Sequence, residues 1–304
     1  MQPLTLISLI AASLLIACST PSAQQSTLPL REDIDLQGHR GARGLFPENS
    51  LPGFKAALEL GVNTLELDLV ISQDSQVVVS HEPWLSEEIC LDSTGQQLTE
   101  NHRLTYNLYS MDYASIRSYD CGTKPHSRFP QQKKMATYKP LLREVVDSAT
   151  SWSQRLERPL PYYNVEIKRR PVGDSIFHPP VETFVYLVLQ AIQESGIQDR
   201  CIVQSFDPQS LQLVHQLAPG LPTALLVENT DGPQANLSQL GFVPDIYSPD
   251  YQLVDLDLTQ FCKAKKMKLI PWTVNDTADM SRLLRLGVDG LITDYPDRAN
   301  QIFP

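Results

Sequence analysis

Near its end the chain reads Leu269-Ile270-Pro271-Trp272-Thr273-Val274 and then, after a helical pattern from Ala278 to Leu286, Gly290-Leu291-Ile292-Thr293. Two short apolar runs joined by a helix of this length predict two parallel strands with the helix packed outside them. Because parallel strands are normally covered on both faces, this unit predicts a sheet enclosed by helices.

The same alternation continues back through most of the chain. We expect strands at 34–37, 64–71, 77–80, 162–167, 201–205, 223–227, 246–248, 269–274 and 290–293. We expect helices at 51–60, 141–150, 181–194, 208–217, 258–265 and 278–286. This repeat predicts an α/β fold, a TIM-like (β/α)8 barrel that spans 34–304. The run 77–80 is a ninth strand and leaves no room for a helix after 64–71, so one βα unit should be irregular.

A segment from about 82 to 137 interrupts the alternation. It contains four tyrosines, two cysteines and the basic-polar stretch 128–134. A structureless loop of this length is uncommon in a compact domain and is usually functional. We therefore expect a subdomain inserted after the third strand, over the mouth of the barrel.

The first 17 residues form an apolar stretch that is too short to span a bilayer and is typical of a signal peptide. Leu15-Ile16-Ala17-Cys18 resembles the lipobox of bacterial lipoproteins, although no Lys or Arg precedes the apolar stretch. The resemblance implies a lipidated Cys18, a flexible tether over 18–33 and a protein anchored to a membrane of the bacterial cell envelope, in the periplasm or on the outer surface. A plain secretory signal with a chance cysteine is the alternative.

The formal net charge of -10 argues against a nucleic-acid partner, because phosphate backbones are bound by basic surfaces. A small phosphodiester needs only local positive charge, so it remains a candidate ligand. Export permits disulfides, and Cys90 and Cys121 both lie in the expected insertion, where a bridge would stabilise a weak core. Cys201 and Cys262 fall on expected strand and helix patterns and are better interpreted as buried thiols.

Chemically active side chains follow the ends of the expected strands. They are His39, Glu66, Asp68, His81, Glu166, Gln204, Trp272 and Asp294. The carboxyl ends of the strands carry the active site in βα barrels, so these side chains should converge.

Glu66 and Asp68 lie on one face of an expected strand, because side chains alternate. Glu166 and Lys168 repeat this spacing on another strand, so a third carboxylate and a cation should join them. Three carboxylates suit a hard divalent cation, although a Glu166–Lys168 pair that serves only stability is the alternative.

Seven motifs occur in a fixed order: His39-Arg40-Gly41, Pro47-Glu48-Asn49-Ser50, Glu66-Leu67-Asp68, His81-Glu82, Glu166-Ile167-Lys168, Trp272-Thr273-Val274-Asn275 and Thr293-Asp294-Tyr295-Pro296. Together they resemble the glycerophosphodiester phosphodiesterase family over nearly all of the chain beyond the tether. That family splits glycerophosphodiesters into glycerol 3-phosphate and an alcohol. Two departures are His81-Glu82, where the family often has His-Asp, and Ser50, where it often has Thr. Ser50 can still cap the following helix.

The resemblance implies a site in which each residue has a role. A divalent cation, calcium or magnesium, would be held by Glu66, Asp68 and Glu166. The general acid and general base would be His39 and His81, in either order. Phosphate oxygens would be held by Arg40 and Lys168, and Trp272 would contact the glycerol.

Two other functions fit parts of this pattern. One is a lipid-cleaving barrel phospholipase of the sphingomyelinase D or phosphatidylinositol-specific type, which should expose an apolar rim near its site. The insertion has no long apolar run, which favours small soluble diesters. The other is an anchored binding protein without turnover, and the presence of every chemically needed residue argues against it.

Overall fold

The computed structural model describes residues 31–98 and 103–303. The expected signal peptide, Cys18 and nearly all of the expected tether lie outside the described residues. Within the described part, no helix combines the length and the apolar character that a bilayer span requires.

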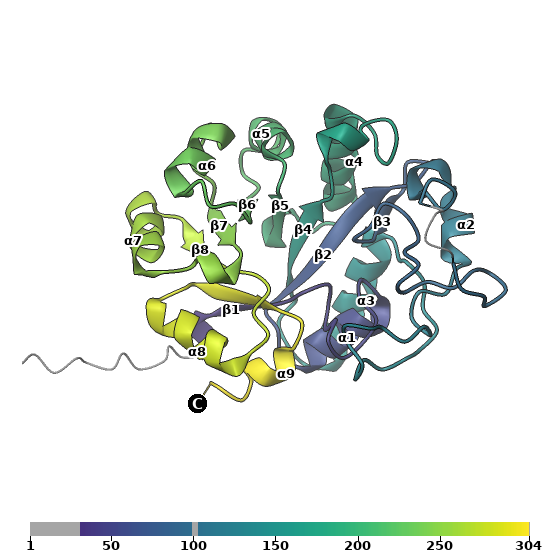
Figure 1. Ribbon diagram of the computed structural model, residues 1–304, viewed down its shortest axis with the longest axis horizontal. Coiled ribbons are helices and arrows are strands. Elements are labelled where there is room, and N and C mark those ends of the chain that lie inside the picture. The colour runs from purple at the N-terminus through teal and green to yellow at the C-terminus, as the bar shows by residue number, and fades with distance from the viewer. Residues whose placement is uncertain (1–30, 99–102, 304) are drawn as a thin grey trace, which may run out of the picture.

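The centre of the molecule is a parallel sheet rolled into a barrel (Figure 1). Its strands, in spatial order, are β8 Lys268–Leu269, β7 Ile246–Pro249, β6 Thr223–Val227, β5 Cys201–Ser205, β4 Tyr162–Ile167, β2 Thr64–Ile71, β1 Asp35–Gly38 and β9 Gly290–Thr293. Backbone hydrogen bonds from Asp289 N to Leu269 O (2.9 Å) and from Ile292 N to Pro271 O (3.0 Å) link the two ends of this order. The sheet therefore closes nearly completely, and the predicted TIM-like barrel is confirmed.

The strand β8 is much shorter than the expected 269–274, so that prediction is wrong in length. Pro271 lies inside the expected strand and has no N–H to donate to a ladder. The chain nevertheless keeps its course beside β7, since Ile270 N donates to Tyr247 O (3.1 Å) and Trp272 N donates to Pro249 O (3.0 Å). These bonds hold Trp272 at the barrel end.

The ninth expected strand is not part of the barrel wall. It is β3 (Val77–Val79), which pairs antiparallel with the end of β2 through Leu69 opposite Val79. The tight turn between them leaves no room for a crossover helix, and a hairpin needs none. This hairpin is the irregular unit that the sequence predicts.

Helices surround the strands on the outside (Figure 1). They are α1 Leu51–Glu59, α3 Leu142–Arg155, α4 Val181–Glu194, α5 Pro208–Leu217, α6 Pro233–Leu240, α7 Leu256–Lys265 and α8 Thr277–Leu286, followed by the short α9 Pro296–Ala299. The expected helices are all present, whereas α6 was not expected. Gln, Asn and Ser make up much of α6, and Leu237 and Leu240 are its buried apolar residues, so its periodic signal is weak.

Two kinds of side chains fill the barrel. An apolar cluster consists of Ile202, Ala224, Ile246, Ile270 and Ile292, with Trp272 packed against it. A polar group lies beside it, in which Asn164 Nδ2 donates to Gln37 Oε1 (2.8 Å) and to Gln204 Oε1 (2.9 Å). This amide network fixes Gln204, which in turn contacts the site.

The described residues between β3 and α3 include the short helix α2 (Tyr113–Arg117) and a disulfide between Cys90 and Cys121. Most of the buried apolar residues described in this segment form a separate cluster with Val70 and Val78 of the β2–β3 hairpin: Leu85, Cys90, Leu98, Leu108, Ile116 and Cys121. The segment therefore packs on the hairpin, at one side of the barrel (Figure 1).

Cys201 and Cys262 are buried free thiols. Burial raises the pKa of both thiols, that of Cys262 to about 12.

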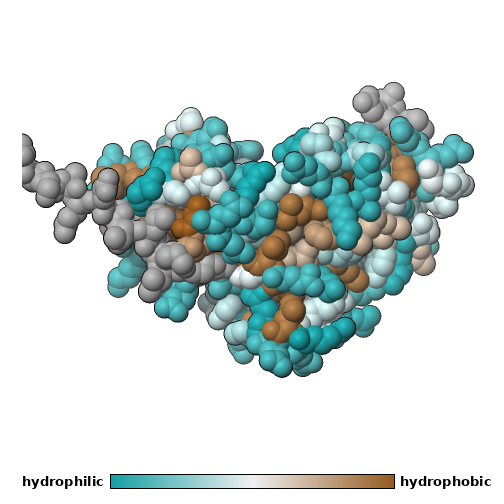
Figure 2. Space-filling model, turned by 90° about the horizontal axis from the view of Figure 1, so that it is seen from below, coloured by the Kyte–Doolittle hydropathy of each residue, from teal (hydrophilic) through white to brown (hydrophobic). Residues whose placement is uncertain are grey.

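On the face shown in Figure 2, hydrophobic residues are exposed in patches between hydrophilic ones.

Candidate active site

The expected site residues come together around one cavity of about 220 Å³. Its lining includes His39, Arg40, Glu66, His81, Glu166, Lys168 and Trp272. Asp68, the remaining candidate, contacts this group from behind, with its Oδ2 3.3 Å from Arg40 Nε and its Oδ1 3.7 Å from Lys168 Nζ. Convergence follows from topology, because β1, β2 and β4 are neighbours whose carboxyl ends lie at one end of the barrel.

The carboxylates of Glu66, Asp68 and Glu166 form a buried trio, with one oxygen of each within 4.8 Å of the others. Asp68 lies directly opposite Glu166 in the β2–β4 register. Burial and the charges of the other two carboxylates raise the pKa of Glu66 well above its usual value. Burial raises that of Glu166 to about 7. Such close acidic oxygens fit a hard divalent cation, which would relieve their mutual repulsion.

Neighbouring groups hold both oxygens of Glu66. Gln204 Nε2 donates to Oε1 (2.7 Å), and the backbone N–H of Arg40 donates to Oε2 (2.8 Å). Asp68 is held by Asn49, whose Nδ2 donates to its Oδ2 (2.8 Å). Although burial acts to raise the pKa of Asp68, the charges of Arg40 and Lys168 together with the other groups around it lower this pKa well below its usual value, so the carboxylate stays ionised.

The loop between β1 and α1 has an unusual backbone that makes these contacts. Arg40 and Asn49 adopt left-handed conformations, with φ of 50° and 49°. Gly41 has φ of 89°, and a Cβ there would lie 2.7 Å from the backbone carbon of Gly53 in α1. Only glycine fits this close approach, which explains its place in the first motif.

His39 is held by an ionised carboxylate. Its Nδ1 lies 2.7 Å from Asp294 Oδ1, and Asp294 also accepts from Arg43 Nε (2.8 Å) and Asn275 Nδ2 (2.8 Å). Since an ionised carboxylate only accepts, Nδ1 carries the proton and Nε2 keeps its lone pair. Burial, together with the Arg43 charge, lowers the pKa of His39 to about 4, so its imidazole is neutral near pH 7.

His81 follows β3 and has a comparable partner. Its Nδ1 lies 2.8 Å from Glu82 Oε1, and its side chain is 27% exposed. Burial lowers its pKa below the usual value, and Glu82 opposes that shift. The Glu that departs from the family pattern therefore orients this imidazole.

Glu48 is paired with Arg40, whose Nη1 donates to its Oε1 (3.0 Å), and lies 3.7 Å from Arg43. Burial acts to raise the Glu48 pKa, but these arginines together with the nearby His81 and Lys139 lower it to about 2. Through these pairs Glu48 helps to orient Arg40 at the site.

Two residues near the site were not among the candidates drawn from the sequence. Lys139 is 4% exposed, and no carboxylate lies within 4 Å of its ammonium group in the described part of the chain. Burial lowers its pKa, while Glu48, Glu82 and Asp68 oppose this. Phe206 follows β5 and meets the Trp272 ring edge-on, with centroids 5.4 Å apart. Its place just after a strand was the signal that could have identified it.

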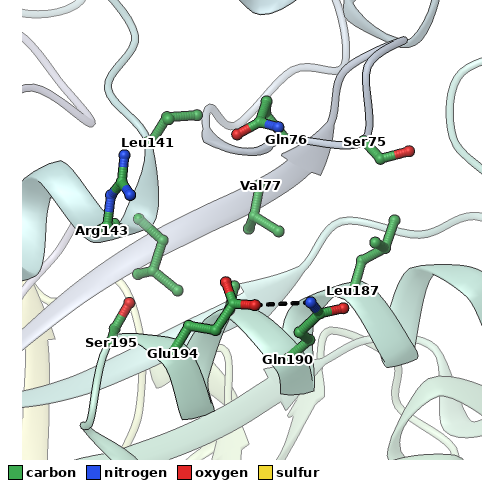
Figure 3. Close-up of a pocket in the computed structure, with 11 residues that line it drawn as sticks. Ser75, Gln76, Val77, Leu141, Arg143, Leu187, Gln190, Glu194 and Ser195 are labelled. Atoms are coloured by element: carbon green, nitrogen blue, oxygen red, sulfur yellow. Dashed lines mark hydrogen bonds between the residues drawn. The ribbon is translucent and has the colours of Figure 1, made fainter.

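A second hollow of about 200 Å³ lies between the β2–β3 turn, the start of α3 and α4 (Figure 3). Gln190 and Glu194 in its wall bond to each other, with Nε2 2.7 Å from Oε1. Its lining residues include no histidine and one carboxylate, so it lacks the groups for acid–base chemistry.

The fold and the site thus define a βα-barrel enzyme with acid–base groups and cations around a cavity for a small anionic substrate. Residues 39–298 match the model of the Glycerophosphoryl diester phosphodiesterase family. The chain belongs to this family and is a phosphoric diester hydrolase.

Individual relatives agree with this assignment. The chain is 30% identical to a glycerophosphodiester phosphodiesterase of Caldanaerobacter subterraneus, over 85% of this chain and 93% of the relative. It superposes on the crystal structure of a Silicibacter pomeroyi protein with a TM-score of 0.79 and 31% identity, over 89% of this chain and 93% of that one. An Oleispira antarctica phosphodiesterase, solved in complex with the product sn-glycerol-3-phosphate, shares the fold with a TM-score of 0.69 and 20% identity, over 90% and 96% of the two chains.

Proposed function

We propose that the chain hydrolyses glycerophosphodiesters to glycerol 3-phosphate and an alcohol, with the aid of a divalent cation and two histidines. The observation that carries the proposal is one small cavity lined by two carboxylate-paired imidazoles, by Glu66 and Glu166 of the carboxylate trio, and by cations that include Arg40 and Lys168. The names of the relatives and the product in the Oleispira antarctica complex support the substrate class.

The cation site would consist of Glu66, Asp68 and Glu166, whose clustered oxygens suit calcium or magnesium. A cation bound there would neutralise charge on the phosphate and polarise its oxygens. The Arg40 and Lys168 side chains would bind the remaining phosphate oxygens, and Trp272 would contact the glycerol. A phosphodiester repels nucleophiles through its own charge, so this neutralisation has to precede attack.

Proton transfer would be shared between the imidazoles. His39 is neutral and has a free Nε2, so we assign it the role of general base. Asp294 would stabilise the imidazolium that forms, as a buried carboxylate does in other His-dependent hydrolases. His81, which is more exposed and paired with Glu82, would protonate the leaving oxygen.

The attacking group in this proposal is the 2-hydroxyl of the glycerol, which would form a cyclic phosphate that water then opens. The test is turnover of diesters with and without that hydroxyl, together with a search for the cyclic product. Equal turnover of both, with no cyclic species detected, would refute the internal attack.

A lysophospholipid is a second candidate substrate, because the segments that follow β3 and β4, at the same barrel end as the site, carry apolar side chains. Val172 and Ile176, on the loop after β4, are 89% and 50% exposed. Phe177 of the same loop packs against Trp84, three residues beyond His81, with ring centroids 5.5 Å apart. Faster release of choline from lysophosphatidylcholine than from glycerophosphocholine would favour the lipid substrate, and the reverse order would favour the soluble one.

We also propose that the protein is exported and anchored to a bacterial membrane through a lipidated Cys18, with 18–33 as the tether. The lipobox-like sequence supports this proposal.

A further inference from the structure

Four cationic side chains line the active-site cavity, and one of them has neither a role in the proposed mechanism nor an acidic partner among the described residues. It is Arg128, which comes from the segment between β3 and α3 and lines the same cavity as His39 and Lys168. The side chain of Arg128 is exposed, as expected at a cavity mouth. A cation at this place would meet part of any bound substrate.

The turn that carries Arg128 is hydrogen-bonded to the loop between β1 and α1, which also carries His39. Gln132 Nε2 donates to the carbonyl of Arg43 (2.7 Å), and Lys133 N donates to Leu45 O (2.8 Å). Phe129, 5% exposed, lies under the Arg43 guanidinium at 4.9 Å. The position of Arg128 is therefore tied to the loop that carries His39, through Arg43 and Asp294.

Arg128 differs from the other cavity cations in its charge balance. Arg40 has Glu48 at 3.0 Å, Arg43 has Asp294 at 2.8 Å and Lys168 has Glu166 at 2.8 Å. Among the described residues, no carboxylate lies within 4 Å of the Arg128 guanidinium, whose ring contact is with Phe129 at 5.5 Å. The positive charge of Arg128 is therefore available to attract an anion at the mouth of the cavity.

The other lining residues indicate which part of the substrate would carry the negatively charged group that Arg128 attracts. An apolar wall formed by Phe206, Leu226, Trp272 and Ile292 suits the carbon face of glycerol. The reacting phosphate already has Arg40, Lys168 and the carboxylate trio as proposed partners. The alcohol is the remaining part of the substrate, and in this arrangement it would extend toward the mouth, where Arg128 lies.

We propose that Arg128 binds a negatively charged group on the alcohol part of the diester, so that the enzyme favours substrates with acidic head groups. This inference rests on the proposed function. Glycerophosphoserine is a suitable example, since it is glycerophosphoethanolamine with one added carboxylate. A guanidinium is well suited to bind a carboxylate and gains nothing from an ammonium group.

The test compares these two diesters, which differ only in that carboxylate. Release of glycerol 3-phosphate gives kcat/KM for each with the wild type, Arg128→Gln, Arg128→Lys and, as a matched control, Lys134→Gln. Lys134 is an exposed cation of the same segment that does not line the cavity. Calorimetric binding of both diesters provides a second readout that does not depend on turnover.

We expect Arg128→Gln to lower the serine-to-ethanolamine ratio of kcat/KM about five- to tenfold, mainly through KM for the serine diester, as expected for one charged contact near solvent. Arg128→Lys should restore most of the ratio, and Lys134→Gln should leave it unchanged. An unchanged ratio in Arg128→Gln, or equal losses on both diesters, would overturn the inference. If neither diester is cleaved, the proposed function fails, while the ratio of the two binding constants still decides the role of Arg128.

Discussion

Replacing Asp294 by Asn removes one charge and keeps the shape of the side chain. Asp294 is 1% exposed and accepts from His39 and from Arg43. We expect Asp294→Asn to lose the stabilisation of the His39 imidazolium that forms during catalysis. The variant should also lose stability, because among the described residues Arg43 then keeps only Glu48, at 3.7 Å, as an acidic partner.

The contacts of Asp294 set the size of the effect. At 2.7 Å from a buried imidazole, a carboxylate contributes about 3 to 5 kcal/mol to the charged form, which corresponds to a loss of about 10² to 10⁴ in kcat. Because His39 has Asp294 as its hydrogen-bonded acceptor, Asn can also favour the wrong tautomer. KM should change little, since Asp294 is absent from the cavity lining.

The assay is steady-state release of glycerol 3-phosphate from glycerophosphocholine at pH 7. Urea unfolding of each variant shows whether the protein remains folded under assay conditions. The control is Asp199→Asn, which changes an exposed carboxylate in the 3-10 helix before β5 and should behave as wild type. A folded Asp294→Asn protein with kcat within threefold of wild type would refute the role assigned to Asp294 and His39.

Three further predictions concern stability and location. The lowered pKa of His39, about 4 against 6.5 in the unfolded chain, means that the unfolded state takes up the proton first as pH falls, so stability is lost below pH 6.5. Between pH 7 and pH 5 this loss is about 2 kcal/mol, and urea unfolding of His39→Gln should lack it; an equal pH dependence would contradict the pKa. The Cys90–Cys121 disulfide closes a loop with a sequence separation of 31. Its removal should lower the free energy of unfolding of the segment that carries it by about 3 to 4 kcal/mol. Identical unfolding with and without reductant would contradict this prediction. Cys18→Ala should move the protein from the membrane fraction to the soluble fraction of fractionated cells. A variant that stays in the membrane fraction would show that the anchor is not at this cysteine.

The strands were predictable because short apolar runs bounded by polar residues leave a clear signal. The direction of β3 was equally constrained, since too few residues separate it from β2 for a crossover. The length of β8 could not be predicted from the sequence, because a proline near a strand end can be tolerated or can end the ladder. The helix α6 escaped notice because tertiary contacts of two leucines, rather than a periodic pattern, hold it in place.

The sequence allowed prediction of those site residues whose position follows from the barrel topology. A residue at the end of a parallel strand must lie at the barrel mouth, which is how His39, Glu66 and Glu166 were identified as neighbours. Lys139 and Arg128 come instead from the segment around the disulfide, whose path depends on long-range packing. No local pattern marks such positions, so only the structure brings them to the site.

The central claim is that Glu66, Asp68 and Glu166 bind a divalent cation that the reaction requires. The most direct measurement follows glycerol 3-phosphate release by purified protein after chelation and after adding back calcium or magnesium, for the wild type and for Asp68→Asn. We predict that chelation abolishes activity, that one of the two ions restores it in the wild type, and that neither restores it in the folded variant. Full activity in the presence of chelator, or equal restoration in Asp68→Asn, would contradict the claim.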